Sequence, residues 1–236
     1  MITCYGVTLA DKKHVIMKTI SIIGQKGGAG KSTLAINLAG ATEAIGLQAV
    51  IIDLDPQASA KAWHDHRKQE SPVVISAQAA RLDEVRRTAE AHGADVCIID
   101  TAPHSETAAL AAAKAADLIL IPCRAAFLDL KAMSTTVDLV QIAKRPALFV
   151  LNALRPGDKS LPEDATMALS SYGIPVCDLR ITQRAAFGHS LTAGQTVMEY
   201  EPGGAAAAEI RDLFMIVCNH VNMITPNKAS REAVSV

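Results

Sequence analysis

The sequence predicts an α/β protein in which helices flank a doubly wound, mostly parallel β-sheet. Short β-branched runs alternate with alanine-rich helical stretches through most of the 236 residues, and this order is typical of βαβ units. Nearly every position in the β-branched runs is apolar, as expected of strands that are buried on both faces. With 50% hydrophobic and 20% charged residues, the chain can form one large core.

The predicted elements follow one another in a regular order. The first strand is expected at residues 19–24, and a helix at residues 31–46. The apolar residues of this helix recur on one face, at Leu34, Leu38, Ala41 and Ile45. Later strands are expected at residues 48–53, 73–76, 95–100, 118–122 and 147–152. An alanine-rich final helix is expected at residues 204–221.

We expect a single domain over residues 18–221. Residues 1–17 are polar and aperiodic, which predicts a poorly ordered leader. Residues 222–236 are rich in Ser, Asn and charge, which predicts a flexible tail.

Composition places the protein in a reducing, aqueous compartment. The five cysteines form no C-x-x-C pair and leave one over in any disulfide scheme; they are Cys4, Cys97, Cys123, Cys177 and Cys218. No apolar run approaches the roughly 18 uncharged residues of a membrane span. We therefore predict a soluble, cytoplasmic protein. Its formal net charge of −1 requires any nucleic-acid binding to come from a local basic patch.

The segment GQKGGAGKST, residues 24–33, predicts a phosphate-binding loop between a strand and a helix. Gly27, Gly28 and Gly30 allow a tight turn whose backbone N–H groups can surround phosphate oxygens. In the general P-loop pattern, Lys31 reaches the β- and γ-phosphates and Ser32 offers its hydroxyl to Mg²⁺. The first glycine of that pattern is replaced by Gln25, so a purely structural glycine turn is the alternative.

Two acidic segments follow later strands, at the edge where open α/β sheets bind ligands. The first is DLDPQ, residues 53–57, and the second is IIDTAP, residues 98–103. Asp100 follows its strand as a Walker B carboxylate does and would hold magnesium through water. A single strand-ending Asp is more often a turn former or a helix cap, but the glycine-rich loop followed by these two segments favours a nucleotide site.

These segments resemble the ParA/MinD group of deviant Walker ATPases, whose loop has the form K-G-G-x-G-K-[ST]. Residues 26–32 match this form, including the additional Lys26. DLDPQ resembles switch I of the family, and DTAP resembles switch II, with Ala102 in place of the first proline of D-T-P-P. A G-x-x-V-x-E-x-x-P pattern is met at residues 194–202. The resemblance covers residues 18–221 and implies a P-loop NTPase fold.

The resemblance also implies a set of site residues for ATP or ADP with Mg²⁺. Lys26 would reach across a dimer interface to the phosphates of the other subunit, and Asp55 would position the attacking water. Asp53 would support magnesium through other ligands, Asn152 would contact the adenine, and Thr182 would lie in a loop over the base. The loop residues expected to bind nucleotide are Lys26, Gly27, Gly28, Ala29, Gly30, Lys31, Ser32 and Thr33.

The family further implies that the output is the positioning of cargo on DNA. ParA-like members bind nonspecific DNA as ATP-bound homodimers, on the nucleoid, and a ParB-like partner stimulates their slow hydrolysis. The basic residues available for DNA phosphates are Arg180, Arg184, Arg211, Lys228 and Arg231. Residues 221–236 contain a proline and no sustained apolar face, so we expect no membrane partner. The sequence most resembles a small ParA of the plasmid-partition type.

Enzymes of the same fold provide an alternative function. Metabolic ATPases such as dethiobiotin synthetase-like enzymes, and redox ATPases such as the nitrogenase iron protein, use a similar loop. The iron protein requires cysteines at a dimer axis, whereas Cys97 and Cys123 lie in or next to predicted strands and are expected in the core. His64 and His66 lack a nearby third ligand, and Trp63 is expected in the core or an interface.

Overall fold

The computed structural model describes residues 16–126, 133–157 and 161–223, and its centre is a seven-stranded parallel sheet. The strand order is β3-β2-β4-β1-β5-β6-β7, and every pairing is parallel. The strands are β1 (Lys18–Ile22), β2 (Ala49–Asp53), β3 (Val73–Ser76), β4 (Val96–Asp100), β5 (Leu118–Cys123), β6 (Ala147–Leu154) and β7 (Val176–Thr182). The order reverses direction at β1, which places the loop after β1 at the usual ligand-binding crevice.

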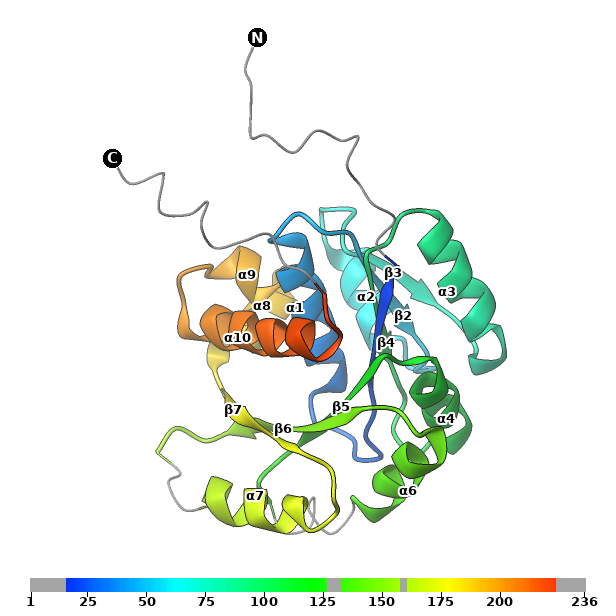
Figure 1. Ribbon diagram of the computed structural model, residues 1–236. Helices are drawn as coiled ribbons and strands as arrows, with labels where there is room; N and C mark the ends of the chain where they lie inside the picture. Colours follow the sequence, from blue (N-terminus) through cyan, green and yellow to red (C-terminus); the bar gives the residue numbers. More distant parts are fainter. Residues whose placement is uncertain (1–15, 127–132, 158–160, 224–236) are drawn as a thin grey trace.

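Helices cover both faces of the sheet (Figure 1). One face carries α1 (Lys31–Glu43), α2 (Ser59–His66), α8 (Ala185–Thr192), α9 (Val197–Tyr200) and α10 (Ala205–His220). The other face carries α3 (Leu82–Ala91), α4 (Glu106–Ala115), α6 (Ser134–Ala143) and α7 (Leu161–Ser170), together with a short 3₁₀ helix, Ala79–Arg81. The predicted doubly wound sheet is confirmed.

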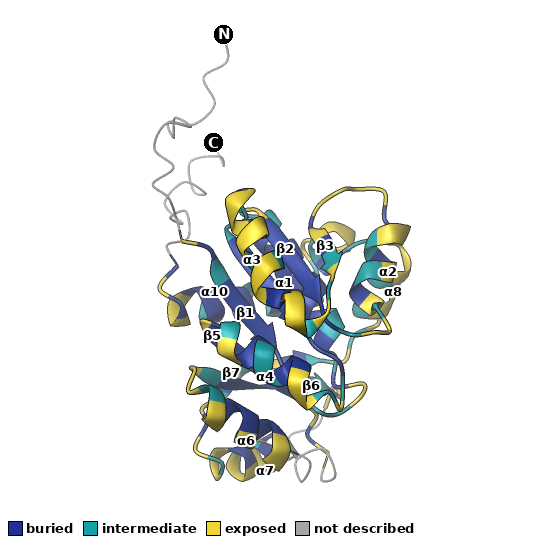
Figure 2. Cartoon of the chain, turned by 90° about the vertical axis from the view of Figure 1, so that its right-hand side faces the viewer, coloured by how far each residue is buried: buried dark blue, intermediate teal, exposed yellow. Residues whose placement is uncertain are grey.

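The two faces form two separate hydrophobic cores. Because side chains alternate along a strand, Ile98 of β4 packs in the first core while Cys97 and Ile99 pack in the second. Figure 2 shows the inner strands β2, β4 and β5 as buried and the helices as exposed on their outer faces. The apolar character of both faces explains why the strand sequences are nearly continuous hydrophobic runs.

The sequence predicted six of the seven strands, with ends that differ by at most two residues. It missed the edge strand β7, in which the exposed Asp178 and Arg180 interrupt the apolar run. The first helix ends at Glu43 rather than at residue 46, and the final helix spans Ala205–His220.

The two ends of the described chain can be compared with the predicted limits of the domain. Met17, which the sequence assigned to the leader, is 2% exposed and packs in the second core. Residues 1–15 and 224–236 lie outside the described residues, so the leader, the tail and the domain limits stay predictions. Within the described ranges, no helix is long and apolar enough to cross a membrane.

Candidate functional site

The glycine-rich loop lies between β1 and α1, as predicted, and two of its glycines have a backbone that other residues rarely adopt. Gly28 has φ of 73° and Gly30 has φ of 91°, in the left-handed region that favours glycine. A Cβ on Gly30 would also lie 2.2 Å from Nδ2 of Asn152. Asn152 donates a hydrogen bond to the Ala29 carbonyl over 2.7 Å, so this asparagine fixes the loop from the end of β6.

Lys31 is buried at the start of α1, with 7% of its surface exposed. Its Nζ donates to the Lys26 carbonyl over 3.3 Å, which holds the ammonium group inside the turn. Burial lowers the pKa of Lys31, and the carboxylates of Asp100 and Asp55 act in the opposite direction. Lys31 is thus placed to neutralise phosphate charge. Lys26 itself is half-buried in the same loop, and its predicted role across subunits stays a prediction.

Asp100 ends β4 as a buried carboxylate that lacks hydrogen-bond donors. It is 0% exposed, and neither of its oxygens has a hydrogen-bond partner among the described residues. Burial raises the pKa of Asp100 to about 7; the hydroxyl of Ser32, which is nearby but does not meet the geometry of a hydrogen bond, acts in the opposite direction. Buried polar groups of this kind normally have a partner. A bound divalent cation would satisfy the Asp100 carboxylate, because Asp100 and Ser32 offer the oxygen atoms that Mg²⁺ prefers as ligands.

Asp53 ends the neighbouring strand β2 and is fully engaged by the backbone. Its Oδ1 accepts from the Asp55 N–H at 3.0 Å, and its Oδ2 accepts from the N–H groups of Ala60 and Lys61, each at 3.1 Å. The residue before α2, Ala58, has no side chain that can cap the helix, so Asp53 satisfies the free N–H groups of the first turn. Burial raises the pKa of Asp53, and these hydrogen bonds lower it. Its support of magnesium stays a prediction.

Asp55 and the loop share one cavity. The cavity has a volume of about 420 Å³. Its lining residues are Gly27, Gly28, Gly30, Lys31, Ser32, Thr33, Ile36, Asp55, Ser59, Trp63, Pro103 and Leu191. The structure therefore brings the predicted water-positioning carboxylate to the same cavity as the predicted phosphate ligands.

Sequence reasoning missed three residues at this site. Trp63 packs in the first core, as expected, but it also lines the cavity together with Leu191. Arg124, which follows β5, donates a hydrogen bond to the Gly28 carbonyl. Trp63 lies one helical turn after Ser59, and this spacing is a weak indication that it faces the cavity. Leu191 and Arg124 belong to no motif that could have indicated their place.

The structure gives internal partners to several residues predicted for the base and for DNA. The Thr182 N–H donates to Oε2 of Glu209 over 3.0 Å, and Arg184 forms an ion pair with Oε1 of the same residue at 2.7 Å. Arg211 donates to the Pro202 carbonyl over 3.0 Å, whereas Arg180 is exposed. Thr182 is not among the described residues that line the cavity. Lys228 and Arg231 lie outside the described residues.

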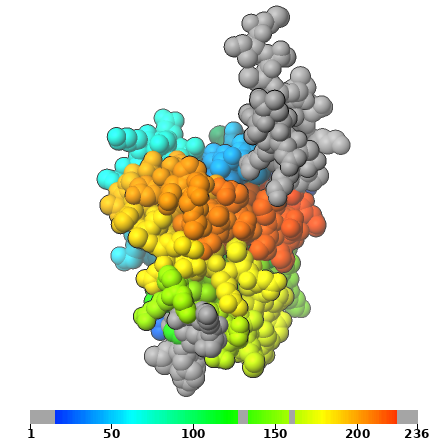
Figure 3. Space-filling model, turned by 90° about the vertical axis from the view of Figure 1, so that its left-hand side faces the viewer, coloured from blue at the N-terminus to red at the C-terminus, as the bar shows by residue number. Residues whose placement is uncertain are grey.

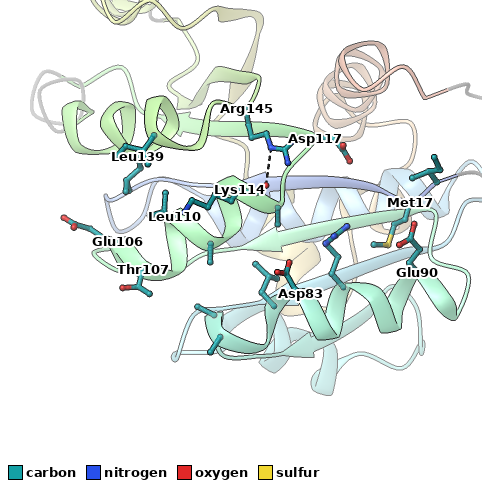
Figure 4. A pocket seen from close by; sticks show the side chains of 18 residues that line it. Met17, Asp83, Glu90, Glu106, Thr107, Leu110, Lys114, Asp117, Leu139 and Arg145 are labelled. Atoms are coloured by element: carbon teal, nitrogen blue, oxygen red, sulfur yellow. Dashed lines mark hydrogen bonds between the residues drawn. The ribbon is translucent and has the colours of Figure 1, made fainter.

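A larger cavity, of about 910 Å³, lies elsewhere and contains none of the predicted site residues that the structure describes. Residues of α3, α4 and α6 line it, with Met17 at one end (Figure 4). Lysine, arginine and acidic side chains are mixed along its walls, and Nε of Arg145 donates to the Lys114 carbonyl over 3.2 Å. It shares no residue with the cavity at the loop, so the nucleotide chemistry is assigned to the smaller cavity.

In the part of the chain that the structure describes, no group of three His, Cys, Asp or Glu residues could hold a metal ion. Cys97, Cys123, Cys177 and Cys218 are buried, and burial raises the pKa of Cys97 to about 12. Cys97 and Cys123 are core residues, as the sequence predicted, and Cys177 and Cys218 also pack in the core.

Comparison with known proteins agrees with this geometry. The family model described as "CobQ/CobB/MinD/ParA nucleotide binding domain" matches residues 20–197. The chain is 31% identical over 196 residues to "Maintenance of carboxysome distribution protein A" of Gloeobacter kilaueensis, with 81% of this chain and 89% of the relative covered. It is 24% identical over 233 residues to "Chromosome-partitioning ATPase Soj" of Thermus thermophilus, with 84% and 94% covered.

A solved structure shows the same fold. The septum site-determining protein MinD of Pyrococcus horikoshii, complexed with Mg-ADP, superposes with a TM-score of 0.70. It is 17% identical, and the match covers 93% of this chain and 100% of that one. At this identity the likeness supports the arrangement of the sheet and helices.

Proposed function

Because the chain belongs to the CobQ/CobB/MinD/ParA nucleotide-binding family and is an ATPase of its ParA/MinD group, we propose that it positions cargo on DNA through an ATP-driven dimer. ATP with Mg²⁺ binds at the loop after β1, and the bound state associates into a homodimer. The dimer holds nonspecific DNA until a ParB-like partner stimulates hydrolysis.

The observation that carries this proposal is the gathering of Lys31, Ser32 and Asp55 at one cavity, with the unsatisfied Asp100 at the adjacent strand end. Phosphoryl transfer requires mainly positioning and charge neutralisation. Lys31 neutralises the β- and γ-phosphates, and Asp55 orients a water molecule on the switch loop. Magnesium, held by Ser32 and Asp100 when bound, supplies further positive charge at the phosphates.

Lys26 gives a reason for ATP to drive dimerisation. A lysine from the partner subunit interacts more strongly with a triphosphate than with a diphosphate, and most strongly when water is excluded between the subunits. Lys26→Ala should therefore keep ATP binding and lose the ATP-induced dimer. Asp55→Ala should keep both, together with DNA binding, and lose turnover.

DNA contacts would be made by basic residues of the C-terminal half through phosphates, and would depend on salt but not on base sequence. Arg180 is the first residue to test, because Arg184 and Arg211 already have internal partners. Such contacts would keep the dimer on the nucleoid. The relatives named above act in carboxysome distribution and chromosome partitioning; here the cargo could be a plasmid, a chromosome or a protein assembly.

The test is binding to two unrelated labelled duplexes with no nucleotide, with ADP, or with a non-hydrolysable ATP analogue and Mg²⁺. We expect binding only with the analogue, equal on both duplexes, and weaker at about 200 mM than at about 50 mM salt. Arg180→Ala should weaken binding, whereas Arg81→Ala removes an exposed arginine elsewhere and serves as the control. An analogue-dependent dimer that binds neither duplex at low salt would reject DNA as the output. The metabolic alternative would then be tested by adding small acid substrates.

A further inference from the structure

Arg67 lies at the end of α2, the helix that follows the switch loop, and its charged group is buried. The side chain is 1% exposed and forms an ion pair with Oε1 of Glu199 at 2.7 Å. Its second terminal nitrogen lies 3.4 Å from Oε2 of the same carboxylate, which gives the two-pronged contact that a guanidinium favours. The guanidinium carbon also lies 4.6 Å from the ring centre of Trp63, within the range of a cation–π contact.

Glu199 has a second role in α9. Its Oε2 accepts hydrogen bonds from the N–H of Thr196 at 2.7 Å and from the Thr196 hydroxyl at 3.0 Å. The first of these forms a capping box with the reciprocal hydrogen bond from the Glu199 N–H to the Thr196 side chain. One carboxylate therefore both starts α9 and holds the end of α2. Glu199 is the glutamate of the G-x-x-V-x-E-x-x-P pattern at residues 194–202. None of these residues is among the described residues that line the nucleotide cavity.

Residues 194–199, which we term the hub segment, also contact α1. The Val197 N–H donates to Oδ1 of Asn37 over 2.8 Å, and Nδ2 of Asn37 donates to the Thr33 carbonyl over 2.8 Å. A Cβ on Gly40 would lie 2.6 Å from the Thr196 side chain, so α1 and the hub segment approach closely.

The hub segment approaches α2 equally closely. Gly194 has φ of 68°, and a Cβ there would lie 2.9 Å from the Arg67 backbone. In Figure 1, α8 and α9 lie beside α1, and in Figure 3 the cyan part of the chain around α2 borders their layer. The hub segment thus fixes the end of the switch helix against the helix that begins at the phosphate loop.

The far end of α2 reaches the nucleotide cavity. Asp53 caps the first turn of α2 and also holds the Asp55 N–H, while Asp55 and Trp63 both line the cavity. A displacement of α2 therefore moves Asp55 and Trp63 relative to Lys31. We propose that Arg67 and Glu199 are positioning residues for ATP hydrolysis, which hold the switch helix so that Asp55 faces the phosphates.

The proposal rests on the role assigned to Asp55, and its test uses basal ATP turnover without DNA or a partner protein. A failure of the DNA output therefore leaves the test unaffected. Glu199→Gln keeps a capping oxygen but removes the charge that Arg67 needs. We expect kcat to fall about tenfold or more, as misplaced catalytic groups cause, and KM for ATP to change less than twofold. If KM rises and kcat is unchanged, the proposal is wrong.

The double variant Arg67→Met/Glu199→Gln separates positioning from stability. A buried guanidinium without its partner destabilises the fold, and removing both charges relieves this. We expect the Tm of the double variant to return towards the wild-type value while kcat stays low. Recovery of kcat together with Tm would show a purely structural ion pair and overturn the proposal.

Two control variants and one optical signal complete the experiment. Val140→Ala truncates the opposite core, and Asp65→Asn removes an exposed ion pair on α2 itself; both should keep kcat within about twofold. Trp63 is the single tryptophan of the chain, so its fluorescence reports on α2. Its emission in the absence of nucleotide should change in Glu199→Gln and stay unchanged in Val140→Ala. An unchanged emission in Glu199→Gln would mean that the pair does not hold α2.

Discussion

β2 and β4 each end in an aspartate, and the two carboxylates differ in their hydrogen-bond partners. Asp53 and Asp100 are directly paired in register, and both are at most 1% exposed. Asp53 accepts three backbone hydrogen bonds, whereas Asp100 has no hydrogen-bond partner among the described residues. The first carboxylate is used to shape the switch loop, and the second is available to a cation. Burial and strand position are therefore the same for the two carboxylates, and only the unsatisfied oxygens of Asp100 support the proposal that it is a magnesium ligand.

The largest effect is expected from Asp100→Asn. Loss of the carboxylate that faces the cation should lower Mg²⁺-dependent turnover by about 100-fold or more, as removal of one preorganised charge-stabilising group does. Stability in EDTA should be unchanged or higher, because the variant removes a buried charge that lacks donors. Turnover and urea unfolding are the measurements. A clear loss of stability in EDTA would show that Asp100 is structural and would remove the contrast with Asp53.

Compared with Asp100→Asn, the variant Asp53→Asn should lose more stability and less turnover. The amide retains one acceptor oxygen, so the cap of α2 or the Asp55 contact is weakened, at a cost of about 1–2 kcal/mol in the free energy of unfolding. This corresponds to a Tm decrease of about 2–8 °C for a domain of this size. Turnover should fall about tenfold through misplacement of Asp55. If Asp53→Asn instead loses turnover as completely as Asp100→Asn with no change in Tm, then Asp53 acts on the magnesium site directly.

The smallest effect concerns Mg²⁺ in the absence of nucleotide. A cation that binds only the folded state at ten times its Kd adds about 1.4 kcal/mol to the free energy of unfolding. Mg²⁺ should therefore raise the Tm of the wild type and of Asp53→Asn, and should leave Asp100→Asn unchanged. Ca²⁺, which prefers more ligands at longer distances, serves as the comparison ion. A Tm increase of equal size in all three proteins would place the cation elsewhere.

Local sequence patterns predicted much of this region. The apolar runs of β1, β2 and β4 and the glycines of the loop determine their own structure, because burial on both faces and positive φ leave few alternatives. The different states of Asp53 and Asp100 could not be predicted, because they depend on where the N-terminus of α2 lies relative to β2. The Arg67–Glu199 pair joins residues separated by 132 positions, and such contacts leave no local pattern.

The edge strand β7 also could not be predicted from its local sequence pattern. Only Cys177 and Ile181 of β7 are buried, and exposed polar residues lie between them, so its sequence lacks the continuous apolar run by which the other strands were found. The internal partners of single arginines also could not be predicted. Arg184 pairs with Glu209, and nothing in its sequence neighbourhood indicates this; its DNA contact stays a prediction.

The most direct test of the ATP-driven dimer is the molecular mass of the wild type and of Lys26→Ala with ADP or with a non-hydrolysable ATP analogue and Mg²⁺. We expect the wild type to change from its monomer mass of 24.9 kDa to twice that value with the analogue alone. Lys26→Ala should bind the analogue and remain a monomer. A wild type that stays monomeric at saturating analogue, or a Lys26→Ala variant that dimerises as the wild type does, would contradict the account.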